Sequence, residues 1–178
     1  DYNTNVYNYK KLPSTLNLIN PAIWFNPDDG IKLGLSNILT FNKFERNPFS
    51  SRHILTANYY FATKGFEIDY SSEFAHVFGH WNLGIEARLT SPNFAINYFG
   101  IGNNSSNPQA NSSKDLDYNR VKIKQFTAGS FIHWKGDLDA KIKLGINYQN
   151  FKVDNTTGRF IGTQFGPNHS IFNNQSFF

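Results

Sequence analysis

The feature that most constrains the fold is an alternation of large apolar and polar side chains with a period of two residues. It recurs over 81–90 and 138–149, and less regularly over 31–42 and 53–62. The clearest stretch is 66–74, with four apolar side chains against four polar ones: Phe66, Ile68, Tyr70 and Phe74 against Glu67, Asp69, Ser71 and Glu73. Because successive side chains of a strand point to opposite faces, this pattern predicts β-strands with one apolar and one polar face.

Following the alternation along the chain predicts about seven strands. They are expected at 15–25, 31–44, 53–62, 66–77, 81–90, 119–134 and 138–153. Residues 1–14 are expected to be a linker or periplasmic lead-in, and no stretch has a helical period. Within 119–134 the apolar residues change phase between Ile123 and Phe126, which indicates either a β-bulge or the edge of a membrane zone. The chain is therefore expected to be all-β.

The polar faces carry many charged side chains. On these predicted faces lie Glu67, Asp69, Glu73, Glu86, Arg88, Lys141 and Lys143. Aromatic residues make up 17% of the chain, yet its mean hydropathy is −0.48, so apolar and polar groups are interleaved. No apolar run is long enough for a membrane-spanning helix. A transmembrane antiparallel up-and-down β-barrel would place the apolar face in lipid and the polar face in a wet lumen.

The connections between the predicted strands give a separate indication. If the first strand rises from the periplasm, the periplasmic links are short, at 45–52, 78–80 and 135–137. Both long links, at 91–118 and from 154 onward, then fall on the outer side. Outer-membrane barrels combine short periplasmic turns with longer external loops, so the link lengths favour the bacterial outer membrane.

Aromatic residues collect near the predicted strand ends. They are Trp24, Phe25, Phe41, Phe44, Tyr59, Phe61, Phe78, Trp81 and Trp134. Strand propensity alone would enrich aromatics without a preference for ends. The positions therefore favour girdles at the two membrane interfaces.

Candidate metal ligands are few. The run from Asn26 to Gly30 contains Asp28 and Asp29 after a proline, and its order is typical of a turn. A calcium site would need further oxygen ligands that the sequence does not supply nearby. Cysteine is absent, and no carboxylate cluster accompanies the histidines, so we expect turn or interfacial roles for them in place of zinc binding. The histidines are His76 and His80, on either side of Gly79, and the isolated His53, His133 and His169.

Enzymatic motifs are also missing. The sequence has no Gly-x-Ser-x-Gly elbow and no Ser-x-x-Lys pair. Glu67, Asp69 and Glu73 could imitate a catalytic pair, but we expect them to pair with Lys or Arg of neighbouring strands. The net charge of +4 is spread along the chain, which gives no support to nucleic-acid binding. We therefore expect no catalytic, cofactor-binding or metal-ligating residues, no cofactor, and a protein that is not an enzyme.

Several short motifs resemble the BamA-like barrels of the bacterial surface antigen superfamily. The resemblance covers about residues 15–110 and rests on an ordered set of segments: 26–30 followed by 31–35, then 51–53, 78–84 and 97–103. The later segments are similar to one branch of the superfamily, in which the barrel often follows a calcineurin-like metallophosphoesterase domain. The resemblance implies a sixteen-stranded barrel whose relatives insert or export outer-membrane proteins.

The resemblance also implies partners and a mechanism. The partners would be outer-membrane lipid and lipopolysaccharide, the remainder of the barrel, and assembly-machinery or substrate barrel proteins. The first strand, about 16–25 and containing Pro21, would open laterally and template an incoming strand. The family's arginine motif, its POTRA repeats and the phosphoesterase ligands do not occur in this chain. We therefore expect part of a larger barrel, ending within an external loop.

Two other functions stay open. The barrel could be the membrane anchor of a surface or periplasmic metallophosphoesterase whose catalytic domain lies outside this chain. It could instead be a soluble lipocalin-like binding barrel, which would require the apolar face to point inward.

Overall fold

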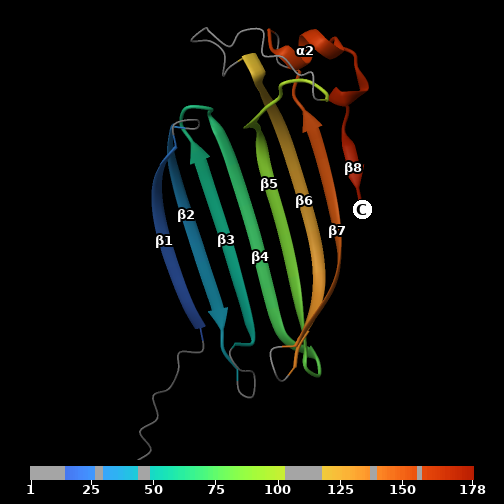
Figure 1. The fold of residues 1–178 in the computed structure, drawn as a ribbon. Coiled ribbons are helices and arrows are strands. Elements are labelled where there is room, and N and C mark those ends of the chain that lie inside the picture. The colour runs from blue at the N-terminus through green and yellow to red at the C-terminus, as the bar shows by residue number, and fades with distance from the viewer. Residues whose placement is uncertain (1–14, 27–29, 44–48, 103–117, 137–139, 156–157) are drawn as a thin grey trace, which may run out of the picture.

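The computed structural model describes most of the chain. The described residues are 15–26, 30–43, 49–102, 118–136, 140–155 and 158–178. They form one antiparallel sheet whose eight strands follow one another in chain order (Figure 1). The strands are β1 (Thr15–Asn26), β2 (Gly30–Phe41), β3 (Ser51–Tyr60), β4 (Gly65–Phe78), β5 (Trp81–Asn97), β6 (Arg120–Lys135), β7 (Lys141–Val153) and β8 (Gln175–Phe177).

The all-β class and the antiparallel order are confirmed, and each predicted strand coincides with one of β1 to β7 within a few residues at most ends. The prediction that a strand ends at residue 90 is wrong, because β5 continues to Asn97. Its pairing with β6 passes from Thr90–Gln125 to Phe94–Ile123, so extra residues of β5 stand opposite one residue of β6. Such a bulge accommodates Pro92, which cannot donate to the ladder.

The phase change near Ile123 lies in β6, and the prediction that a β-bulge in this strand causes it is wrong. β6 pairs with β7 in an unbroken register from Ile123 to Lys135, and the irregularity lies in β5. The apolar side chains of β6 therefore change face without any break in that ladder.

The long link predicted from residue 154 onward contains regular elements that the sequence pattern did not predict. This segment contains the helix α2 (Phe160–Phe165), the 3₁₀ helix η2 (Ser170–Phe172) and the short strand β8, which pairs with β7. A six-residue helix is too short to show a helical period in the sequence, so the pattern could not reveal it.

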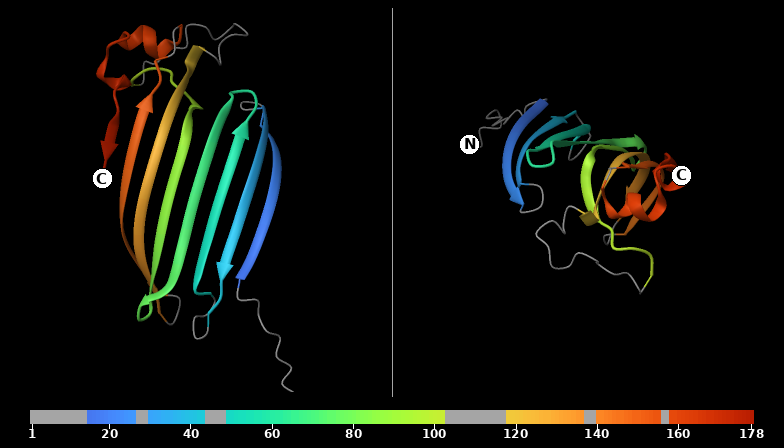
Figure 2. Two further views of the ribbon diagram at one scale, coloured as in Figure 1. Left: turned by 180° about the vertical axis from the view of Figure 1, so that it is seen from behind. Right: turned by 90° about the horizontal axis from the view of Figure 1, so that it is seen from above.

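The described residues form a single layer. β1 and β8 are the two edges of the sheet, and no pairing joins them within the described part of the chain. Figures 1 and 2 show α2 at one end of the strands, next to β6 and β7, and not stacked over the middle of either face. None of the described helices is long and apolar enough to cross a membrane.

The turns alternate between the two ends of the strands, as in an up-and-down sheet. The short link predicted at 78–80 is confirmed, since Phe78 pairs with Trp81 across Gly79 and His80. Gly79 has a φ of +59°, which is typical of the first central residue of a type II′ hairpin. The two long connections, after β5 and after β7, leave from the same end of the sheet (Figure 1).

Candidate functional site: a two-faced sheet

The strand register brings the predicted polar faces together on one side of the sheet. One row across five strands consists of Thr56, Asp69, Arg88, Thr127 and Gln149, each the register partner of the next. The register also places all seven predicted charged residues on this polar face: Glu67, Asp69, Glu73, Glu86, Arg88, Lys141 and Lys143. The side-chain alternation therefore predicted the correct face for each of them.

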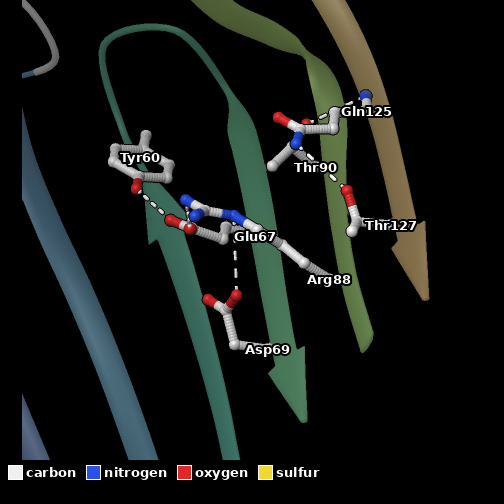
Figure 3. A network of polar contacts seen from close by, with 7 residues as sticks. All are labelled: Tyr60, Glu67, Asp69, Arg88, Thr90, Gln125 and Thr127. Atoms are coloured by element: carbon white, nitrogen blue, oxygen red, sulfur yellow. Dashed lines mark hydrogen bonds and ion pairs between the residues drawn. The ribbon is translucent and has the colours of Figure 1, made fainter. Parts of the chain in front are cut away.

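Arg88 of β5 is the centre of a charged network on the polar face (Figure 3). Its guanidinium forms an ion pair with Glu67, and its Nε lies 3.5 Å from Oδ1 of Asp69. The Tyr60 hydroxyl donates a hydrogen bond of 2.6 Å to the other oxygen of Glu67. Because the Glu67 side chain is only 6% exposed, these contacts replace the water that its carboxylate loses. The expected pairing of carboxylates with a neighbouring basic residue is thus confirmed here.

A neutral polar network continues beside Arg88. The backbone N–H of Gln125 donates to Oγ1 of Thr90 at 3.0 Å, and its side-chain amide donates to Thr127 at 3.1 Å (Figure 3). Neither Tyr60 nor these three residues stood out in the sequence. Thr90 shares the face of Arg88 because it lies two residues further along β5. The register places Tyr60, Gln125 and Thr127 on the same face.

A second polar cluster contains Glu73, Asn82 and His133. The Asn82 amide donates to Oε1 of Glu73 at 3.0 Å, and Nε2 of His133 lies 3.2 Å from the same oxygen. The prediction that His133 is isolated is therefore wrong. His133 is far from Glu73 in sequence and becomes its neighbour because β4, β5 and β6 are adjacent.

The other histidines have separate surroundings. His53 lies on the apolar face, where its Nδ1 is 2.9 Å from the Tyr70 hydroxyl, so it is not isolated either. His169 accepts a hydrogen bond from the backbone of η2. The His76 and His80 rings meet edge to face at 6.1 Å.

Metal binding finds no geometric support in the described part of the chain. There, no three His, Asp or Glu side chains lie close enough together to hold an ion. Asp28 and Asp29, the calcium candidates, lie outside the described residues.

The polar face is hollowed over β3 to β7. The hollow has a volume of about 750 Å³ and is lined by charged, amide and hydroxyl groups and also by apolar residues, among them Ile54 and Phe131. The Phe131 ring lies across Gly84, and Nζ of Lys143 is 3.6 Å from the centroid of this ring. This surface offers many hydrogen-bonding groups to water or to a polar solute.

The opposite face is apolar and mostly uncovered. Ile23 and Ile146, near opposite edges of the sheet, are 77% and 79% exposed. Other exposed side chains on this face are Ile19, Leu33, Leu35, Leu55, Ile68, Ile85, Ile142 and Leu144. Two further hollows, of about 710 and 500 Å³, lie over β5 to β7 and over β1 to β4 on this side. An exposed apolar surface of this extent indicates an interaction surface.

The aromatic residues of the predicted girdles lie near both ends of the strands. One group consists of Trp24, Phe25, Tyr59 and Phe61, and the other consists of Phe41, Phe78, Trp81 and Trp134. Phe44 lies outside the described residues.

Comparison with known proteins gives no assignment: no family model, no curated protein and no solved structure matches this chain. The functional argument therefore depends on the two faces of the sheet.

Proposed function

We propose that this chain is part of a bacterial outer-membrane β-barrel, with the apolar face against lipid and the polar face lining a wet interior. The observation that carries the proposal is the uncovered apolar face, which runs from β1 to β7. A soluble fold buries such a face against a second layer, and no second layer occurs among the described residues. Lipid would cover the face, while hydrogen bonds between strands satisfy the backbone.

The polar face supports the same orientation. On this face Glu67 and Asp69 form ion pairs with Arg88, and the face lines a hollow that spans five strands. A lipocalin-like barrel would need the reverse, with the apolar side chains turned toward the interior. The charged side chains in this hollow, Asp69, Glu86, Arg88 and Lys143, therefore favour a wet lumen over an apolar ligand cavity.

Within this setting we propose a role in outer-membrane protein insertion or transport, which rests on the resemblance to BamA-like barrels. The edge strand β1 is compatible with that role, because within the described residues it pairs only with β2. Pro21 lies in the middle of β1 opposite Leu35. Since proline cannot donate to a ladder, an additional strand on β1 would be held by fewer hydrogen bonds and could be exchanged.

Orientation in the membrane can be tested by site-specific labelling, because the chain contains no native cysteine. Single cysteines at Leu144 and Ile146 would carry an environment-sensitive dye on the apolar face. Matched labels at Lys143 and Asn147 would lie on the polar face of the same strand. We expect quenchers attached to lipid tails to act on the first pair and a water-soluble quencher to act on the second. Equal quenching of both pairs, or a protein that stays soluble without detergent, would contradict the membrane orientation.

The insertion role needs its own experiment. A photo-crosslinking residue at Ile23, on the edge strand, is expected to capture unfolded outer-membrane proteins during their insertion. The control is the same residue at Leu55 of β3, a strand that already has neighbours on both sides. Equal capture at the two positions would contradict strand templating at β1 without affecting the membrane proposal.

A further inference from the structure

A group of basic side chains lies at one end of the apolar face. Arg120, Lys122 and Lys124 alternate along β6 on the same side as Phe126, and Lys152 of β7 is the register partner of Lys124. We call Lys122, Lys124 and Lys152, together with Arg120, the basic cluster. It lies at the end of the sheet from which the two long connections leave.

Among the described strands, the basic cluster is the one place where the apolar face carries Lys or Arg. Elsewhere on the apolar face, the described parts of β1 to β7 contain no Lys or Arg. Successive side chains of β6 on this face are Ala128, Phe126 and Lys124, so the face changes from apolar to basic between Phe126 and Lys124. The phase change in the sequence of β6 therefore coincides with the limit of the apolar zone.

The three lysines of the cluster have no ion-pair partner among the residues that the structure describes. Lys124 and Lys152 are exposed and directly opposite each other, and like charges in such a pair repel. Asp154 lies beside Lys122, with its backbone N–H 2.8 Å from the Lys122 carbonyl. An external anion at this position would relieve the repulsion.

The surface next to the cluster indicates what carries that anion. The rings of Phe126 and Tyr148 lie 6.3 Å apart on the apolar face. Toward the middle of the sheet, Phe126 is the next residue after Lys124 on this face, and Tyr148 follows Lys152 after Asn150. Exposed Ile146 and Leu144 continue along β7 away from the cluster. A ligand that matches this order has a phosphate at one end and hydrocarbon chains below it.

We propose that the basic cluster binds the phosphorylated headgroup of an anionic membrane lipid. The acyl chains would lie against Phe126, Tyr148 and Ile146, and the phosphate oxygens would accept hydrogen bonds from Lys124 and Lys152. This inference rests on the proposed membrane location and adds the lipid class and the binding site.

The test compares binding of the protein to phosphatidylcholine vesicles with and without phosphatidylglycerol, at low and high salt. Basic side chains next to an anionic surface each strengthen binding about fivefold. The double variant Lys124→Gln/Lys152→Gln should therefore lose about 30-fold of the preference for anionic vesicles. The matched control, Lys141→Gln/Lys143→Gln, removes two exposed lysines from the polar face of β7 and should retain the preference.

The outcomes separate this inference from the membrane proposal. Insertion of wild-type protein into both kinds of vesicle, with no change in the Lys124/Lys152 variant, would overturn the lipid site and leave the membrane location standing. Failure to enter either kind of vesicle would overturn the membrane location and the lipid site with it. The preference for anionic vesicles could also be lost when inorganic phosphate replaces chloride at equal ionic strength. This result would indicate a site for free anions and would overturn the lipid assignment.

Discussion

Removal of the Arg88 charge tests whether the polar face is held by its ion pairs. In the variant Arg88→Met the side chain keeps most of its length but leaves Glu67 and Asp69 beside each other without a cation. Loss of one partner of a fully buried pair costs about 3–5 kcal/mol, and loss from an exposed pair costs about 0–1 kcal/mol. Glu67 is 6% exposed and Arg88 is 44% exposed. We therefore expect an intermediate loss in the free energy of unfolding, about 2 kcal/mol.

The assay is urea unfolding of protein folded in detergent, followed by the fluorescence of Trp24, Trp81 and Trp134. A double-mutant cycle with Glu67→Gln isolates the pair from other effects of each substitution. Removal of both charges should lower the free energy of unfolding by less than the sum of the two single losses, with a coupling energy of about 1 kcal/mol. Lys141→Met is the control, because Lys141 is exposed on the same face and should change stability by less than about 0.5 kcal/mol.

Two results would refute this reasoning. A loss below about 0.5 kcal/mol for Arg88→Met would mean that the network contributes no more than an ordinary surface charge. Additive single variants would mean that Arg88 and Glu67 do not interact in the folded protein.

Three further predictions concern packing and the two faces. Gly84→Ala should lower stability by about 1–2 kcal/mol in the same unfolding assay, because an added Cβ would overlap the Phe131 ring. Leu144→Arg should weaken folding into bilayers by about 2–4 kcal/mol, whereas Asn147→Arg on the polar face should be tolerated, as measured by the folded fraction on gels. Ile161→Ala should cost about 2 kcal/mol, since Ile161 is the buried side chain of α2, and protease resistance of residues 158–178 should fall.

The strands themselves were predictable because strand geometry is local. Alternation over 66–74, 81–90 and 138–149 reports which side chains share a face, and this needs no information about neighbouring strands. For the same reason the charged face and the aromatic strand ends were correctly located. The end of β5 was not, because Pro92 indicates a loop unless the neighbouring strand reveals a bulge.

The register between paired strands was beyond the sequence pattern. The network of Arg88 with Glu67 and Tyr60 joins residues on three strands, and a shift of register would separate them. His133 looked isolated for this reason, although it lies 3.2 Å from Glu73.

The sequence by itself determined an all-β chain with one apolar and one polar face, since the alternation of side chains is a property of each strand. Only the tertiary structure decided the register between neighbouring strands, where the bulge lies, and that α2 forms at the end of β6 and β7. It also brought Lys124 and Lys152 opposite each other, although 27 positions of chain lie between them. Contacts between strands depend on register and order, and these are set by many side chains acting together.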